Sequence, residues 1–164
     1  MTLKYKLPLC FSLCVAANAF GLPLSTEGKG EVYGLWLERD KQKVAVLVED
    51  CQGQLCGKIV WLKKPYKKDG KPKLDSKNPD KARRNTPRCG LTILSGFTAV
   101  DKNHWRDGTI YNPSDGDTYR STIELTDQGE LEVRGYVGIP FFGITTHWIR
   151  PNSKLQWCNS NWYE

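Results

Sequence analysis

The chain of 164 residues carries 24 Lys and Arg against 18 Asp and Glu, a formal charge of +6, together with 15 Gly, 9 Pro and 6 Cys. This length suits one small domain and excludes a multidomain enzyme. A hydrophobic content of 39% with 26% charged residues excludes wholesale disorder and also excludes collagen-like and coiled-coil architectures.

The first 19 residues are typical of a secretory signal peptide of the Sec type. Lys4 and Lys6 precede an apolar run over residues 7–16, and Ala17-Asn18-Ala19 provides a small-x-small cleavage site. A buried N-terminal helix is the alternative, which Pro8 within the run disfavours. The run is too short to span a bilayer. We expect cleavage after Ala19 and a soluble, periplasmic or secreted protein that does not span a membrane.

Cleavage would remove two lysines, two cysteines and no acidic residue, which leaves 22 basic against 18 acidic residues and a charge of +4. We expect residues 20–31 to form an N-terminal extension and residues 32–164 to form a single β-barrel domain.

The four remaining cysteines predict two disulfides, because an exported chain meets an oxidising compartment. A Gly53-Gln54 loop of type II′ would place Cys51 directly opposite Cys56 on a hairpin. Cys89–Cys158 then follows by elimination. A zinc site is the alternative, but the four cysteines do not form two close pairs.

Beyond the signal peptide, short strand-like runs alternate with turn sequences, and no long helical period competes with them. The predicted strands, with Lys154–Cys158 as a possible ninth, are Val32–Glu38, Val44–Glu49, Leu55–Leu62, Leu91–Val100, Trp105–Tyr111, Thr118–Leu125, Glu130–Val137 and Phe142–Arg150. Hairpin-length connections favour antiparallel pairing of sequential strands. The expected fold is all-β, an antiparallel up-and-down barrel of about eight to nine strands whose closure removes the sheet edges.

One connection, residues 63–88, is long and strongly basic. Asn78-Pro79-Asp80 predicts a short helix over Pro79–Arg84, and Asp75 is expected either to pair with Arg83 or to cap a turn. The segment is either a solvated loop or a lid or patch for anionic partners, among which nucleic acid is not expected. Against three aspartates, its basic residues are Lys63, Lys64, Lys67, Lys68, Lys71, Lys73, Lys77, Lys81, Arg83, Arg84 and Arg88.

Gly34-Leu35-Trp36 resembles the opening signature of lipocalins and related calycin barrels. In those proteins the Trp closes the base of the barrel beneath an Arg of the last strand, and Trp148-x-Arg150 is placed to supply that Arg. The resemblance therefore implies a barrel-closing set of Gly34, Trp36, Trp148 and Arg150.

A wider set of motifs resembles a bacterial exported family named domain of unknown function 2147, over about residues 32–150. This resemblance implies a small calycin-like (lipocalin-like) barrel of Gram-negative bacteria and no established activity. Besides the two motifs above, it rests on Cys56-Gly57-Lys58-Ile59-Val60-Trp61-Leu62, Asp75-x-x-Asn78-Pro79, Gly90-Leu91, Gly108-x-Ile110-Tyr111-Asn112-Pro113-x-x-Gly116-x-x-Tyr119 and Val133-Arg134-Gly135-Tyr136-x-Gly138.

Residues for catalysis are few, so we expect no enzyme, no cofactor and no metal. His104 and His147 are the only histidines, and no Ser or Cys motif marks a nucleophile beside either. Aromatic side chains are plentiful, and small barrels either fill with them or keep room for one ligand. The candidate ligand-binding residues are Trp61, Trp105, Tyr111, Tyr119 and Arg150.

Three functional hypotheses follow. In the first, a monomer binds a small hydrophobic or amphipathic molecule in its barrel. In the second, the barrel is solid and the basic loop docks on an anionic envelope polymer or a protein partner. An unrecognised hydrolase or isomerase is the third. The loop residues of the second hypothesis are Lys67, Lys68, Lys71, Lys73, Arg83 and Arg84.

Overall fold

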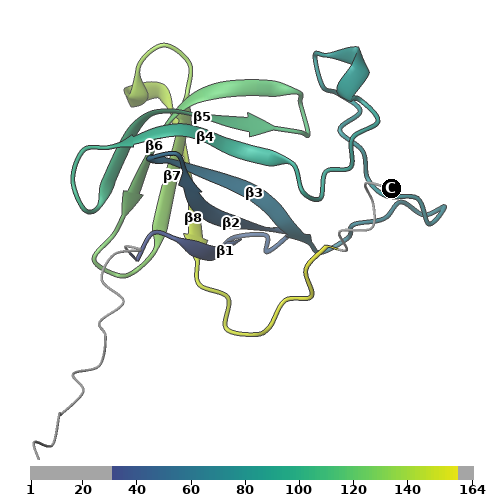
Figure 1. Ribbon diagram of the computed structural model, residues 1–164, viewed down its shortest axis with the longest axis horizontal. Coiled ribbons are helices and arrows are strands. Elements are labelled where there is room, and N and C mark those ends of the chain that lie inside the picture. Colours follow the sequence, from purple (N-terminus) through teal and green to yellow (C-terminus); the bar gives the residue numbers. More distant parts are fainter. Residues whose placement is uncertain (1–30, 159–164) are drawn as a thin grey trace, which may run out of the picture.

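The computed structural model describes residues 31–158. The predicted signal peptide and nearly all of the predicted N-terminal extension lie outside these residues. Eight antiparallel strands pair in sequence order and close into one barrel (Figure 1). They are β1 (Gly34–Glu38), β2 (Val44–Cys51), β3 (Gln54–Leu62), β4 (Thr92–Ala99), β5 (His104–Asn112), β6 (Asp117–Leu125), β7 (Leu131–Tyr136) and β8 (Ile144–Ile149).

The predicted all-β up-and-down barrel is confirmed, with each strand boundary within two residues of its predicted position. A ninth strand over Lys154–Cys158 is wrong, because these residues form no ladder. The segment is instead joined to the barrel by the Cys89–Cys158 disulfide and by the Cys158 N–H, which donates to the Val60 carbonyl at 2.7 Å. Within residues 31–158, no helix is long and apolar enough to cross a membrane.

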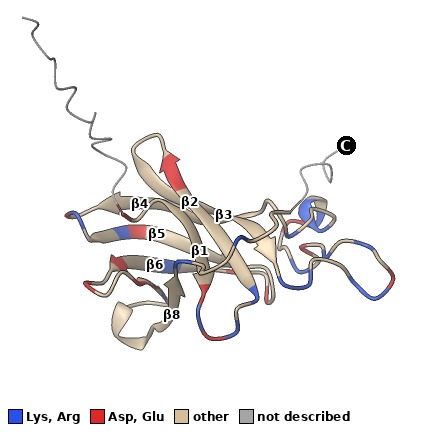
Figure 2. Ribbon diagram, turned by 90° about the horizontal axis from the view of Figure 1, so that it is seen from below, with Lys and Arg blue, Asp and Glu red and all other residues tan. Residues whose placement is uncertain are grey.

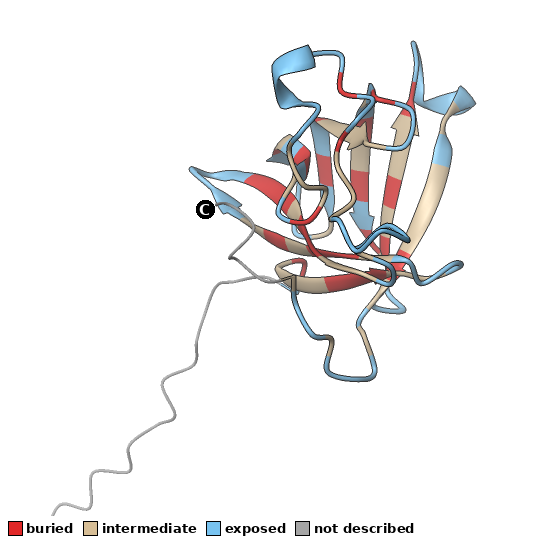
Figure 3. Cartoon of the chain, turned by 90° about the vertical axis from the view of Figure 1, so that its right-hand side faces the viewer, coloured by how far each residue is buried: buried red, intermediate tan, exposed pale blue. Residues whose placement is uncertain are grey.

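Side-chain alternation positions the strands, as β6 illustrates. Ser121, Ile123 and Leu125 are buried, whereas Arg120, just before them, and Glu124, between the last two, are exposed. Figure 3 shows buried and exposed stretches following one another along the strands, whereas the long connections are mostly exposed. Inward apolar residues therefore set the register, because a slip by one residue would expose all of them.

The hairpin between β2 and β3 differs from its predicted register. Its two loop residues are Gln52 and Gly53, with φ of 59° and 84°, and Cys51 is paired with Gln54. Two positive φ values define a type I′ turn, not the predicted type II′ turn. Cys51 and Cys56 are therefore diagonal neighbours, but their Cα atoms lie 5.9 Å apart and the predicted disulfide is present.

A β-bulge changes which side chains of β3 face the interior. Ala45 of β2 pairs with Trp61 whereas Val46 pairs with Ile59, so Val60 is an extra residue on β3. One extra residue reverses the alternation beyond it. Leu62 consequently lies on the inner side, and Trp61 lies on the outer one.

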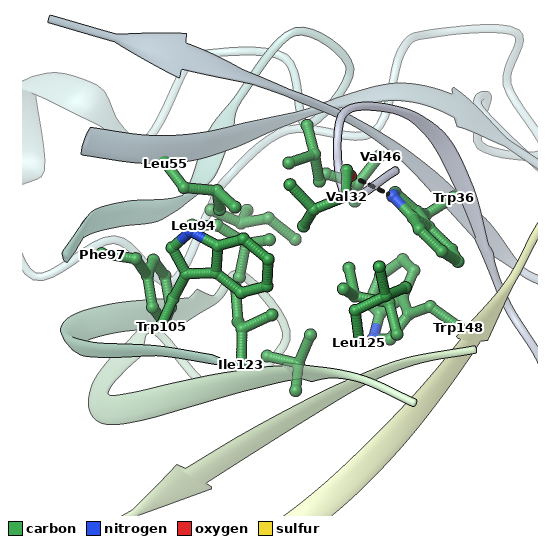
Figure 4. Close-up of a cluster of buried hydrophobic side chains, with 14 of the residues drawn as sticks. Val32, Trp36, Val46, Leu55, Leu94, Phe97, Trp105, Ile123, Leu125 and Trp148 are labelled. Carbon is green, nitrogen blue, oxygen red and sulfur yellow. Dashed lines mark hydrogen bonds between the residues drawn. The ribbon is translucent and has the colours of Figure 1, made fainter. Parts of the chain in front are cut away.

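The end of the barrel that holds Trp36 is filled. Trp36, Leu55, Phe97, Trp105 and Ile123 belong to one buried cluster, in which the Trp36 indole N–H donates to the Val32 carbonyl at 2.7 Å (Figure 4). Aromatic and branched side chains from all sides of the barrel interdigitate here. No room for a ligand remains at this end.

Arg150 covers the outside of the filled end. Its guanidinium lies 3.8 Å from the centre of the Trp36 ring and donates to the backbone carbonyls of Glu31, Tyr33 and Leu35. Gly34 makes this contact possible, because its φ is 108° and an added Cβ would lie 3.1 Å from the guanidinium. Burial lowers the pKa of Arg150 below its ordinary value.

The basic connection carries a 3₁₀ helix, η1 (Lys81–Arg83), which is shorter than the predicted helix. Its cap is Asp80 and not Asn78, since the Asp80 carboxylate accepts from the Ala82 N–H at 2.9 Å. Asp80 also forms an ion pair with Arg83 at 3.5 Å. One expectation had assigned Arg83 to Asp75 instead.

A second 3₁₀ helix, η2 (Pro140–Phe142), lies in the connection between β7 and β8. The predicted last strand included Phe142, but β8 begins only at Ile144. Pro140 opens the 3₁₀ turn, and the Gly143 N–H donates to the Pro140 carbonyl at 3.0 Å.

Candidate functional site

A cavity of about 700 Å³ occupies the end of the barrel opposite the filled cluster. Its wall is mainly apolar and comes from the strands, and Trp148 belongs both to this wall and to the buried core. The barrel is therefore hollow on one side of its core and solid on the other. The apolar wall consists of Val44, Ile59, Leu62, Ile93, Ile110, Val133, Ile144 and Trp148.

The connections supply every charged residue of the cavity lining except Glu38, which ends β1, so these charges lie at the mouth. Glu38 and Asp115 are the acidic residues of the lining. Its five cations, which leave an excess of positive charge, are Lys43, Lys63, Lys64, Lys73 and Arg88. Figure 2 shows the blue stretches of Lys and Arg along the connection between β3 and β4.

Backbone carbonyls of two connections hold the side chain of Arg88 at the mouth. It donates from Nε to the Leu74 carbonyl at 3.1 Å and from one terminal nitrogen to the Pro113 carbonyl at 2.6 Å. Within residues 31–158, no carboxylate forms a salt bridge with it. This half-buried guanidinium, whose positive charge no described carboxylate neutralises, can therefore bind an anionic group at the mouth.

Asp75 anchors the basic connection to the barrel wall. Its carboxylate is fully buried and accepts from the Tyr111 hydroxyl at 2.7 Å and from the Asn78 side-chain amide at 2.6 Å. Burial, together with this hydrogen bond, raises the pKa of Tyr111 to about 12. The phenol therefore stays protonated at neutral pH and donates. This contact replaces the alternative in which Asp75 paired with Arg83.

Tyr119 also lines the cavity, and its hydroxyl makes a similar contact at a more solvent-exposed position. Its hydroxyl donates to Asp115 at 3.2 Å, and the Asn112 side-chain amide donates to the same carboxylate at 2.6 Å. Burial raises the pKa of Tyr119 above its ordinary value. Two tyrosines thus line the cavity while carboxylates accept hydrogen bonds from their hydroxyls.

The structure brings together two of the five residues predicted to bind a ligand. Tyr111 and Tyr119 line the cavity. Trp61 does not, because of the bulge at Val60, and Trp105 is part of the buried cluster at the filled end. Arg150 lies outside the barrel, over Trp36.

The basic-loop residues also divide between two locations. Lys73 lines the cavity, whereas Lys67, Lys68 and Lys71 are exposed and lie outside the lining. Arg84 donates from Nε to the Asn78 carbonyl at 2.8 Å. It therefore supports the loop, as Arg83 does through Asp80.

Sequence reasoning missed most of the apolar wall. The sequence signal for Ile110 was only its apolar character within a predicted strand, two residues after Gly108. The structure places Gly108 on the inner face, because an added Cβ there would overlap the buried Phe97 ring. Lys43 and Arg88 gave no such signal, because only the closed barrel brings them together.

The two histidines lie away from the cavity lining. His104 is exposed, and its ring is hydrogen-bonded to Asp101 at 2.8 Å, which raises the pKa of the histidine. His147 faces Glu132 across the β7 and β8 pair at 3.4 Å. Among the described residues, no three His, Cys, Asp or Glu side chains form a group that could hold a metal ion.

Comparison with known proteins agrees with this architecture. The chain is similar to the solved structure of protein HP1028 from the human pathogen Helicobacter pylori, which belongs to the lipocalin family. That protein shares 25% sequence identity with this chain and superposes with a TM-score of 0.66, over 80% of this chain and 94% of its own. No curated protein matches the sequence. Residues 34–150 match the family described as "Uncharacterized protein conserved in bacteria (DUF2147)", and the chain belongs to this family of lipocalin-like barrels.

Proposed function

We propose that this protein binds a small amphipathic molecule, with the apolar part inside the barrel and an anionic group at the mouth. The observation that carries the proposal is the cavity of about 700 Å³ with an apolar wall. Ligand sites commonly measure about 300–1,000 Å³ and combine an apolar lining with a few polar groups. The lining contains neither histidine nor cysteine, so binding suits it better than catalysis.

The charge of the mouth supports an anionic group on the ligand. Five cations and two acids line the cavity, and the Arg88 guanidinium has no carboxylate partner among the described residues. A ligand carboxylate or phosphate would find charge-assisted donors there. Its apolar part would gain free energy by leaving water for the barrel.

The ligand is proposed to be met in the periplasm or outside the cell. Two disulfides support this location, because such bonds persist in oxidising compartments. The predicted signal peptide is consistent with it.

Two fluorescent probes of similar size test the function. 1-Anilinonaphthalene-8-sulfonate carries an anionic group and N-phenyl-1-naphthylamine does not. We expect the protein to bind both and to prefer the anionic probe. Ile110→Trp, which fills the cavity, should weaken both by about tenfold or more, whereas Thr122→Trp on the outer face should not. Wild-type affinity of Ile110→Trp for both probes would contradict the proposal.

A second candidate function uses the basic loop to bind an anionic polymer. It rests on the observation that, within the described residues, Arg83 with Asp80 is the loop's only ion pair. Lys67, Lys68 and Lys71 are exposed, so their charges are available.

Binding to polyphosphate, measured over a range of salt concentrations, tests this second function. Changing the three lysines together to Glu should abolish salt-sensitive binding. Lys102, Arg106 and Arg120 lie outside the basic loop and provide the matched triple change. An equal loss of binding in both triple variants would mean that only net charge matters, and would refute a role specific to the loop.

A further inference from the structure

An exposed apolar loop stands at the open end of the barrel. Eight large hydrophobic residues are exposed in the described part of the chain, and five of them lie between residues 137 and 144. Such a concentration of exposed apolar surface marks an interaction site more often than scattered single residues do. These five residues, which we call the apolar loop, are Val137, Ile139, Phe141, Phe142 and Ile144.

The exposure of this loop is a built feature. Arg134 on β7 donates from Nε to the Pro140 carbonyl at 2.7 Å, from a second nitrogen to the Phe141 carbonyl at 3.0 Å and from a third to the Thr145 hydroxyl at 2.8 Å. The guanidinium thus satisfies the backbone of η2 from beneath. Phe141 and Phe142 pack edge to face with ring centres 5.2 Å apart, and they remain 81% and 75% exposed.

The apolar loop borders the cavity mouth. Ile144 is 78% exposed and also belongs to the cavity lining. The basic connection between β3 and β4 leaves the same end of the barrel, because antiparallel strands place alternate connections together. In Figures 1 and 3 both short helices, η1 and η2, lie toward the top of the view, on opposite sides of the molecule.

We propose that this end of the barrel docks on an anionic lipid surface. Phe141, Phe142 and their neighbours would enter the interface between headgroups and acyl chains, and the lysines of the basic connection would meet the negative headgroups. Neither feature would suffice alone, since weak apolar insertion and weak charge attraction reinforce each other. The proposal goes beyond ligand binding and does not depend on it.

A second copy of the chain fits this face less well. A two-fold dimer across the apolar loops would cover the apolar residues but would offer no negative charge to the lysines of either basic connection. A negatively charged bilayer complements both the apolar loop and the lysines.

Vesicle flotation of the mature, disulfide-bonded protein tests the docking. Phosphatidylcholine vesicles are compared with vesicles that contain about 30% phosphatidylglycerol, in about 0.1 M salt. We expect binding to the anionic vesicles only. The double change Phe141→Ser and Phe142→Ser should weaken it by about tenfold or more. Val100→Ser, which replaces a hydrophobic residue that is 53% exposed on another connection, should leave it unchanged.

Two further measurements distinguish loss of membrane docking from misfolding or self-association. The double variant should unfold in urea at the same midpoint as the wild type, which shows that its barrel is intact. Sedimentation velocity reports self-association. Equal flotation of wild type and double variant would overturn the proposal, and so would a wild-type dimer that ignores vesicles and that the double variant abolishes.

Discussion

Tyr111→Phe tests whether the contact between Asp75 and the barrel wall holds the basic connection in place. The change removes one hydroxyl and leaves the ring that lines the cavity. Asp75 is fully buried, so its carboxylate cannot turn to water for a replacement. It keeps the hydrogen bond from Asn78 at 2.6 Å and loses the one from Tyr111 at 2.7 Å.

The magnitude follows from the burial of the acceptor. A hydrogen bond to a charged group contributes about 1.5–3 kcal/mol, and an acceptor left without its partner in the interior bears its own desolvation cost. We therefore expect Tyr111→Phe to lower the free energy of unfolding by about 2 kcal/mol. Tyr119→Phe is the matched control, because its hydroxyl also bonds a carboxylate but in an exposed place. We expect a loss of about 0.5 kcal/mol or less there.

Equilibrium unfolding in urea, with both disulfides intact, measures the two changes. The dependence of unfolding free energy on urea should keep its slope, so that the midpoint reports stability. Equal losses for Tyr111→Phe and Tyr119→Phe would refute the reasoning, since burial of Asp75 would then contribute nothing.

The pH dependence of stability supplies a second test of the same contact. Because the folded-state pKa of Tyr111 is about 12 against an ordinary value of 10.0, the folded protein holds this proton longer than the unfolded chain. The associated stability is present below pH 10 and is lost as the pH rises from about 10 towards 12. Absorbance titration of the wild type should show a late-ionising tyrosine that is absent from Tyr111→Phe and still present in Tyr119→Phe.

Three further predictions concern the rest of the barrel. Changing both Cys89 and Cys158 to Ser should lower the free energy of unfolding by about 4 kcal/mol in non-reducing urea titrations, whereas removal of the hairpin disulfide in the same way should lower it by about 2 kcal/mol. Equal losses would show that the length of the closed loop is not the cause. The pKa of His104, measured by NMR, should lie above 6.5, and Asp101→Asn should return it toward that value; an unchanged titration would remove the proposed cause. Gly34→Ala should cost about 1 kcal/mol or more in thermal unfolding because of its positive φ, and a neutral result would mean that the strand end adapts.

The strands could be predicted from the sequence because each one obeys a local rule. Inward residues such as Ile123 and Leu125 alternate with charged ones, and the turn sequences between strands limit the connections. The two disulfides were also predictable, although the hairpin register was not. The observed loop, Gln52-Gly53, and the predicted loop, Gly53-Gln54, are offset by one residue. Both include Gly53, which can adopt the positive φ that either turn type requires.

The candidate site could be predicted only in part, because it depends on long-range register. Tyr111 and Tyr119 were predictable from their strand positions. Trp61, a candidate ligand-binding residue, lies on the outer side instead, because simple alternation has no means of showing a bulge at Val60. Arg88 joins the mouth through backbone carbonyls that lie 14 and 25 residues away. No local pattern encodes such a contact.

The outward course of the apolar loop also escaped sequence reasoning. Local pattern places Phe142 and Ile144 in one strand, since a run of apolar residues is usually buried. The 3₁₀ turn at Pro140 and its support by Arg134 direct this run into solvent. Exposed and buried apolar runs have the same sequence pattern, so only the folded structure shows which of them is exposed.

Native mass spectrometry tests the central claim, that the hollow end of the barrel holds an amphipathic molecule. The mature protein and its Ile110→Trp variant would be purified under mild conditions from a host that makes the protein naturally. We predict that the wild type carries an added mass that denaturation releases, and that the filled variant lacks it. Bare protein under all mild conditions, or the same added mass on the filled variant, would contradict the account.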